Sequence, residues 1–208
     1  MTDKTDFTKS LDAYRASRGS FRLVDVPELQ YLMIDGHGDP NTAPEFAEAV
    51  AALYPVAYTL KFASKRELGR DYVVPPLEGL WRADDMDSFT AARDKSRWDW
   101  TLLLMVPDWI DSARYAAAVE QVRAKKDRPT RLDDVRLETL DEGPCVQTLH
   151  VGAFDDEAPV LAQLHHEFMP SQGLRFAGHH HEIYLSDRRR VAPEKMRTIL
   201  RQPVSADV

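Results

Sequence analysis

The chain contains the same order of predicted elements twice, and this repetition limits the folds that it can adopt. Apolar, β-prone runs bounded by turn residues predict strands, and longer runs with a period near 3.6 predict helices. The first half has strands at 21–26, 29–34, 72–74, 77–82 and 98–106, and a helix after residue 42. The second half has strands at 135–140, 145–151, 179–186 and 197–204, and a helix from about 155 to 173. Each half therefore contains a strand, a helix and two further strands in that order, with other strands beside them.

This order predicts an α+β fold built from duplicated βαββ units. The two units would form an antiparallel sheet, with two main helices flanking a ligand cleft over it. We expect a single domain over residues 1–208, in which the first repeat covers about 21–107 and the second about 135–204. A helix at about 108–126 would connect them.

Local signals predict where the helices begin. Thr42 followed by Glu45 has the spacing of a capping box, in which each side chain satisfies a backbone N–H of the first turn. Asp108 is the predicted cap of the connecting helix, and Asp155 or Asp156 that of the third helix. Pro55 lies inside the first helical pattern and predicts a bend or a break there.

The first helix carries two stripes of side chains. An apolar stripe suits contact with the sheet and consists of Phe46, Val50, Leu53, Ala57 and Leu60. A second stripe carries Tyr54, Tyr58 and Lys61. Because a helix that covers a sheet needs one apolar stripe, the second row favours a place for the tyrosines at the edge of a cleft.

Composition and charge exclude several classes of protein. The 208 residues carry a formal net charge of −7, which disfavours nucleic acid as a partner because phosphate binding requires a surplus of Lys and Arg. No stretch approaches the roughly 20 apolar residues that span a bilayer, and the first 20 residues lack the apolar run of a signal peptide. The single cysteine, Cys145, cannot form an internal disulfide. We therefore expect a cytoplasmic protein with no membrane partner.

Two matching segments contain the candidate site. Residues 75–81 and 179–187 each read as a short strand in which an aromatic residue follows a carboxylate by two or three positions. The period of two places His180, Glu182 and Tyr184 on one face of the second strand. Glu78 is either the predicted equivalent of Glu182 in the first repeat or a structural partner that hydrogen-bonds to a loop amide. A carboxylate beside an aromatic ring on a sheet face can hold a flat, polarised or cationic small molecule.

Each candidate residue also has a structural interpretation. Glu182 could lie on a solvated strand face, and Tyr184 could pack in the core. Trp81 and Trp100 lie in predicted strands and are candidates either for the core or for an aromatic cage, whereas Trp98 and Trp109 are assigned to packing. Alternation along the strand separates His180 from its neighbouring histidines, so the run of three does not predict a metal site.

Several motifs resemble the GyrI-like small-molecule-binding family, in the same order and over nearly the whole chain. They lie at residues 34–41, 53–61, 76–81, 142–147, 150–152, 180–187 and 198–204. The resemblance implies two βαββ units related by a pseudo-two-fold axis, with a ligand cleft at their junction and a glutamate, here Glu182, inside it. In relatives this domain is often attached to a DNA-binding segment. That segment has no counterpart here, so the chain is similar to stand-alone members, among them the cyclopropanoid cyclopropyl hydrolases.

The resemblance and the residue patterns together give the expected site. Glu182 and Tyr184 are the candidate catalytic residues, and we expect a small-molecule ligand with no cofactor and no metal. The hypotheses are hydrolysis of an activated cyclopropane, or binding of flat hydrophobic or cationic xenobiotics without turnover; the oligomeric state stays open. The predicted ligand-binding residues are Tyr54, Tyr58, Trp81, Trp100, Phe176, Glu78 and His180.

Overall fold

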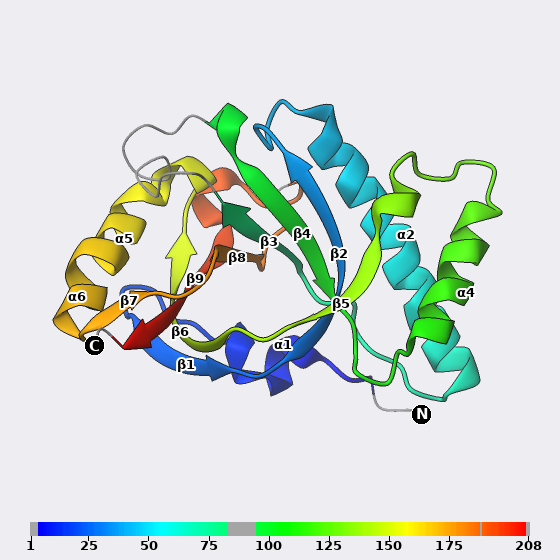
Figure 1. Ribbon diagram of the computed structural model, residues 1–208, viewed down its shortest axis with the longest axis horizontal. Helices are drawn as coiled ribbons and strands as arrows, with labels where there is room; N and C mark the ends of the chain where they lie inside the picture. Colours follow the sequence, from blue (N-terminus) through cyan, green and yellow to red (C-terminus); the bar gives the residue numbers. More distant parts are fainter. Residues whose placement is uncertain (1–3, 83–94, 188, 207–208) are drawn as a thin grey trace.

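The computed structural model describes residues 4–82, 95–187 and 189–206, and within them the chain forms a 9-stranded sheet covered by helices (Figure 1). Eight strands follow the order β1-β6-β9-β8-β3-β4-β2-β5, and β7 pairs with β9 beside this path. All of these pairings are antiparallel. The strands are β1 Arg22–Val26, β2 Leu29–His37, β3 Leu77–Arg82, β4 Asp99–Met105, β5 Arg136–Leu140, β6 Gly143–Val151, β7 Leu174–Phe176, β8 His180–Tyr184 and β9 Arg197–Ala206. The predicted α+β fold with an antiparallel sheet is confirmed.

The sheet has matching arrangements on either side of its centre. Strands β2, β4 and β3 form one side, β6, β9 and β8 form the other, and β3 pairs with β8 where the sides meet. The outer strands are exchanged, since β1 pairs with β6 and β5 pairs with β2. Strands from both parts of the chain thus hold the sheet together at three places.

Helices cover one face of the sheet. Helix α2, Pro44–Glu67, lies along β2 and β4, and α4, Ser112–Arg123, packs on α2 (Figure 1). The helices α5, Ala158–Gln163, and α6, Met169–Ser171, cover the β6–β9 side and are joined by a π-helical turn, Leu164–Phe168. No helix in the described part of the chain is long and apolar enough to cross a membrane.

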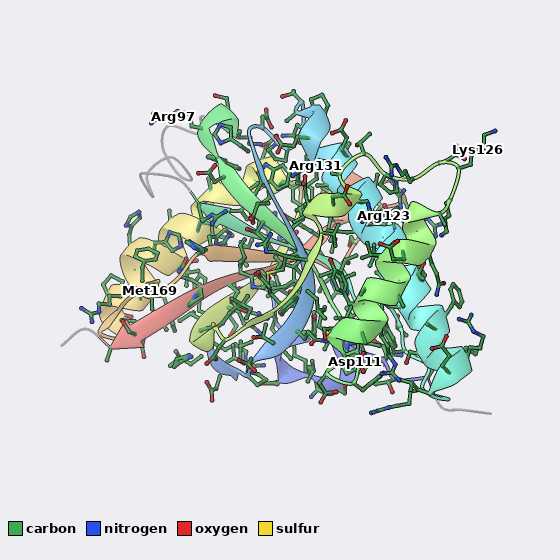
Figure 2. All side chains as sticks on the ribbon, turned by 45° about the vertical axis from the view of Figure 1, so that its right-hand side comes forward. Arg97, Asp111, Arg123, Lys126, Arg131 and Met169 are labelled. Carbon is green, nitrogen blue, oxygen red and sulfur yellow. The ribbon has the colours of Figure 1, made fainter. Side chains whose placement is uncertain are left out.

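The helix starts differ from the predicted ones. The N-cap of α2 is Ala43, which makes no side-chain hydrogen bond, so the predicted capping box at Thr42 is wrong. The first helical residue is Pro44, which has no backbone N–H that a cap would need to satisfy. Asp111 caps α4 by accepting from the backbone of Arg114, at the end of the helix opposite Arg123 (Figure 2). Glu157 precedes α5. Asp108 and the pair Asp155 and Asp156 are therefore not caps.

Pro55 does not break α2. The helix is continuous from Pro44 to Glu67 and contains Pro55 in its interior. Packing explains this tolerance, because Leu53, Val56 and Leu60 are fully buried on either side of the proline. The burial of these side chains offsets the one backbone hydrogen bond that a proline removes.

Side chains alternate between the two faces of the sheet along Trp98 and β4. Trp98, Trp100, Leu102 and Leu104 belong to the core beneath α2, and Leu103 and Met105 to the core on the other face. Trp100 lies over its cross-strand partner Gly36, where a β-carbon would come within 2.0 Å of the indole ring. Strand β2 extends to His37, three residues beyond its predicted end at residue 34, so this glycine belongs to a strand.

The N-terminal segment covers the face of the sheet opposite the helices. Helix α1, Phe7–Ser10, and the short 3-10 turn Asp12–Tyr14 contribute Phe7, Leu11 and Tyr14 to clusters with Ile183 and Ile199. Sequence patterns did not predict these elements, because both are too short to show a helical period.

A buried network of charged side chains lies beneath this segment. His181 lies 3.0 Å from Glu78 and 2.9 Å from Glu142, and Arg201 donates to Glu142 at 2.6 Å. Tyr14 donates to Glu78 at 2.5 Å, and Arg201 also donates to the carbonyl of Ala13. Because each carboxylate faces a cation, the network neutralises its own charge, and its two contacts with residues 13 and 14 hold the N-terminal segment on the sheet.

The network predicts that stability falls at alkaline pH. Burial by itself lowers the pKa of His181. The carboxylates of Glu142 and Glu78 together have a larger effect in the opposite direction, so the pKa is raised from an ordinary value of 6.5 to about 9. Because the pKa of His181 is higher in the folded state than in the unfolded state, its protonation stabilises the fold. This contribution is complete below pH 6.5 and is lost as the pH rises through about 9. We expect the free energy of unfolding in urea to fall by about 3 kcal/mol between pH 6.5 and 9.5.

The variant His181→Gln provides the control for this prediction. It should be less stable at pH 6.5 and should lose most of the slope between pH 6.5 and 9.5, because Gln does not titrate. An equal slope in both proteins would show that His181 is not the group responsible.

Candidate functional site

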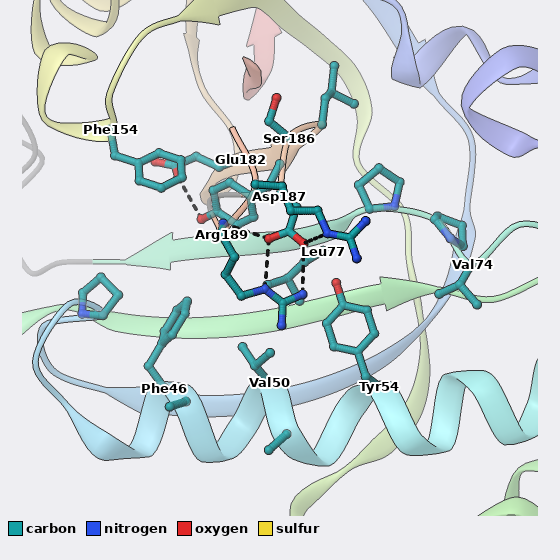
Figure 3. Close-up of a pocket in the computed structure, with 18 of the residues that line it drawn as sticks. Phe46, Val50, Tyr54, Val74, Leu77, Phe154, Glu182, Ser186, Asp187 and Arg189 are labelled. Carbon is teal, nitrogen blue, oxygen red and sulfur yellow. Dashed lines mark hydrogen bonds and ion pairs between the residues drawn. The ribbon is translucent and has the colours of Figure 1, made fainter. Parts of the chain in front are cut away.

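A cavity of about 1040 Å³ opens on the helix-covered face of the sheet. One wall is α2, and the floor comes from β3 and β8, which meet at the centre of the sheet (Figure 3). Further walls come from residues 73–76, from Phe154, Glu157 and Leu161, and from the loop after β8. The volume is at the upper end of the range of roughly 300–1,000 Å³ that small-molecule sites occupy.

Glu182 lies in this cavity at the centre of a short chain of hydrogen bonds. Its side chain is 13% exposed. Tyr184 donates its hydroxyl hydrogen to Glu182 Oε2 at 2.8 Å, and Trp81 Nε1 donates to the Tyr184 hydroxyl at 3.1 Å. The chain therefore fixes one carboxylate oxygen and leaves the other to a different partner.

The register between β3 and β8 makes room for this chain. Gly79 is the cross-strand partner of Glu182, and Trp81 is the partner of His180. A β-carbon on Gly79 would lie 3.0 Å from both the Tyr184 hydroxyl and Trp81 Nε1. The glycine thus leaves the space in which the tyrosine and the indole meet.

Tyr184 keeps its proton in this environment. Burial, and then the neighbouring charge of Glu182, raises the pKa of Tyr184 well above 10. The charge of Glu157, a buried carboxyl that also lines the cavity, adds to this rise. Tyr184 is therefore a hydrogen-bond donor to Glu182 and not a source of protons near neutral pH.

Histidines lie behind Glu182. His180 Nε2 is 3.4 Å from Glu182 Oε1, and the ring of His165 lies 6.5 Å from that of His180. Burial, followed by the neighbouring histidines, lowers the pKa of His165 to about 3, so that this ring is neutral at physiological pH. His181 points to the opposite face, into the buried charge network, so these three histidines do not converge on one point.

Aromatic rings form the walls around Glu182. Trp81 stacks with Phe46 at 6.4 Å and meets Trp98 edge to face at 5.5 Å. Phe154 meets Tyr184 edge to face at 5.4 Å. These contacts place a carboxylate between π faces in a largely desolvated hollow.

The structure brings five of the predicted site residues together. Tyr54, Tyr58, Trp81, Glu182 and Tyr184 all line the cavity. Periodicity explains why these pairs could be predicted from the sequence. The two tyrosines share one face of a helix, and Glu182 and Tyr184 share one face of a strand.

The other predicted ligand-binding residues do not line the cavity. Trp100 is fully buried over Gly36 and donates to the carbonyl of Gly38. Phe176 is exposed on β7 and contacts His165. His180 lies beneath Glu182 and is 2% exposed.

Glu78 is not the counterpart of Glu182. Cross-strand partners share a face, and Glu78 pairs with Ile183 while Glu182 pairs with Gly79. Successive residues alternate between faces, so Glu78 points away from the cavity and joins His181 in the network on the opposite face. Glu78 is thus offset by one position from the residue that pairs with Glu182, and this offset places the two carboxylates on opposite faces of the sheet. The matching sequence motifs did not reveal the offset.

Sequence patterns missed several lining residues. Trp98 was assigned to packing although its alternation with Trp100 placed it on the face toward α2. Phe154 and Glu157 precede α5 and carry no local signal of a site. Asp187 accepts from Arg189 at 3.0 Å, and this pair lies between β8 and α2 (Figure 3).

The fold and the cavity define a class of protein: a small-molecule-binding domain in which paired halves of a sheet share one pocket. A family model described as the GyrI-like small molecule binding domain matches residues 111–205. The chain belongs to the GyrI-like small-molecule-binding family.

Two structures from Listeria innocua are similar over the whole chain. An uncharacterized conserved protein shares 42% identity with a TM-score of 0.87, over 97% of this chain and 100% of that one. A hydrolase shares 40% identity with a TM-score of 0.83, over the same shares. The EcmrR C-terminal domain has the same fold at 10% identity, with a TM-score of 0.54, over 90% of this chain and 98% of that one. No curated protein matches significantly.

The different places of Trp81 and Trp100 give a testable contrast. Trp100→Phe should reduce the free energy of unfolding by about 1–3 kcal/mol, because it leaves a void over Gly36. It should change the affinity for a planar cationic dye such as proflavine by less than about two-fold, because Trp100 does not line the cavity.

Trp81→Phe should weaken proflavine binding by about three- to ten-fold, because it removes the indole N–H that holds Tyr184 against Glu182. Urea unfolding and calorimetric titration of both variants measure the two effects. Equal losses of affinity would contradict the assignment.

Proposed function

We propose that the protein binds flat hydrophobic or cationic aromatic molecules, with the ligand held against Glu182 between the rings of the cavity. The observation that carries this proposal is the buried Glu182 carboxylate among Trp81, Tyr184 and Phe154. A carboxylate in a site of low dielectric attracts a positive or polarised ligand more strongly than one in water. Each well-placed ring adds about 0.5–2 kcal/mol when the ligand is cationic.

We further propose that the protein hydrolyses ligands that carry a cyclopropane conjugated to a carbonyl group. Glu182 positions a water molecule and accepts one of its protons as the water oxygen bonds to a cyclopropane carbon. The ring C–C bond breaks, and its electron pair moves through the conjugated system to the carbonyl oxygen. That oxygen takes up a proton from solvent, which balances the proton accepted by Glu182. The relief of ring strain supplies the driving force for the step. A positioned base such as Glu182 adds about 10²–10⁴-fold to its rate.

Tyr184 has a positioning role in this proposal. Sequence patterns identify Tyr184 as a candidate catalytic residue, and its hydroxyl is the group that could act. In the structure this hydroxyl donates to Glu182 and accepts from Trp81. By holding Oε2, Tyr184 limits the orientations of the carboxylate that accepts the proton of the nucleophilic water.

Binding without turnover is the second candidate function, and one observation favours it. The Tyr184 hydroxyl already donates its hydrogen to Glu182, and the Trp81 indole N–H already donates to the Tyr184 hydroxyl. Fewer donors are then left to stabilise charge on a ligand carbonyl. In this case the protein would sequester or sense its ligand.

The variant Glu182→Gln tests catalysis. The purified protein is incubated with an excess of an alkylator that contains a cyclopropane, and the products are followed by mass spectrometry. We expect many molecules of product, each heavier by one water, per molecule of protein. Glu182→Gln should reduce this rate by about 10²–10⁴-fold, because the amide does not accept the proton of the water.

Two controls separate catalysis from binding. Glu78→Gln removes a carboxylate on the opposite face, so the rate should persist in material that remains folded. Ligand recovered unchanged from the wild-type protein, with binding that depends on Glu182, would support the binding function and contradict hydrolysis.

A further inference from the structure

A row of aromatic rings leads from the cavity along the outside of α2. Tyr54, Tyr58 and Phe62 follow one another at intervals of four residues, so they share one face of the helix. Successive ring centroids are 6.3 Å apart in both steps, with interplanar angles of 26° and 29°. Tyr54 and Tyr58 line the cavity, and Phe62 is the next ring beyond them.

The core does not require the outer two rings of this row, although Tyr54 packs against it. Leu53, Val56 and Leu60 on α2 are fully buried, whereas Tyr58 is 46% and Phe62 is 54% exposed. Exposed aromatic side chains in a row cost solubility without adding to the core. Their continuity with a cavity suggests that a ligand covers them.

The cavity is elongated along the same helix. Its lining on α2 extends from Phe46, which stacks on Trp81, to Tyr58. These twelve steps correspond to about 18 Å at 1.5 Å per residue. Residues 73–76 form the facing wall, and Asp6 and Thr8 also line the cavity. A single compact ring system beside Glu182 would leave much of this length empty.

We propose that Tyr54, Tyr58 and Phe62 form a second stacking subsite, which binds the planar tail of an elongated ligand whose head lies beside Glu182. The ligand class is therefore a rod of two or more linked planar ring systems. This inference rests on the proposed binding function for the position of the head. It adds the length of the ligand and the direction in which the tail runs.

The charges near Phe62 restrict the tail further. Lys61 Nζ lies 4.8 Å from the centre of the Phe62 ring. Asp71 pairs with Lys61 at 2.6 Å and with Lys65 at 3.2 Å, so two cations share one carboxylate. A second cation on the tail would meet this positive excess, and the subsite therefore prefers a neutral tail to a cationic one.

A ligand pair that differs in its tail tests the subsite. Thioflavin T joins a cationic 3,6-dimethylbenzothiazolium head to a neutral dimethylaniline ring, and 2,3,6-trimethylbenzothiazolium is the same head with a methyl group in place of that ring. Calorimetric titration gives the affinity of both, and thioflavin T fluorescence also reports whether its two rings are held rigidly. Tyr58→Ala and Phe62→Ala should each weaken thioflavin T about three- to ten-fold and change the affinity of the head by less than about two-fold.

Matched variants distinguish the subsite from the site beside Glu182. Leu23 on β1 is also 54% exposed, and Leu23→Ala should leave both affinities unchanged. Glu182→Gln should weaken both ligands by a similar factor, because both carry the same head. Since Tyr58 and Phe62 are exposed, thermal unfolding should be nearly unchanged in their variants.

The outcomes separate the two proposals. Equal losses for thioflavin T and for its head in Tyr58→Ala and Phe62→Ala, or no loss for either, would overturn the second subsite. Tail-dependent losses that persist while Glu182→Gln has no effect would support the subsite and contradict the proposed place of the head. Failure of thioflavin T to bind the wild-type protein would count against both.

Discussion

The register between β3 and β8 is the constraint on which the rest of the structure depends. These strands come from different halves of the chain and pair at the centre of the sheet, with Gly79 opposite Glu182 and Trp81 opposite His180. The pairing brings an indole, a phenol and a carboxylate into one hydrogen-bonded chain, because Gly79 has no side chain to occupy the space between them. A slip of one residue would exchange the faces of β8, placing His181 in the cavity and Glu182 in the buried network.

The network on the opposite face gives a physical reason for this register. Glu78, His181, Glu142 and Arg201 are buried together, and each charge has a partner of opposite sign. Ion pairs of this kind contribute little net stability relative to apolar packing, but leaving one member unpaired is costly. A shifted register would separate His181 from both carboxylates. The network therefore favours the native alignment over its neighbours, and it also anchors the N-terminal segment through Tyr14 and the carbonyl of Ala13.

The cavity combines features that the proposed binding would use with features that the proposed hydrolysis would use. Its aromatic walls suit flat ligands of many kinds, because stacking depends on area and weakly on chemical detail. Glu182 adds a directional charge, and the hydrogen bond from Tyr184 limits the orientations that this charge can take. The same arrangement can attract a cation or position a water molecule. Under the proposed functions, the reactivity of the ligand decides between the two uses, since one fold can host more than one activity.

Local sequence determined the long helices, most of the strands and the faces of their side chains, but not the short N-terminal elements or the helix caps. Periodicity placed Tyr54 with Tyr58, Glu182 with Tyr184, and Trp98 with Trp100, since these relations depend on residues that are close along the chain. Tertiary structure alone decided which faces meet. It placed Trp100 over Gly36, turned Glu78 away from Glu182, and brought Phe154 and Glu157 to the cavity. Strand register and long-range packing set these contacts, and they depend on pairs of residues far apart in sequence, whose relative alignment no local pattern of this chain contains.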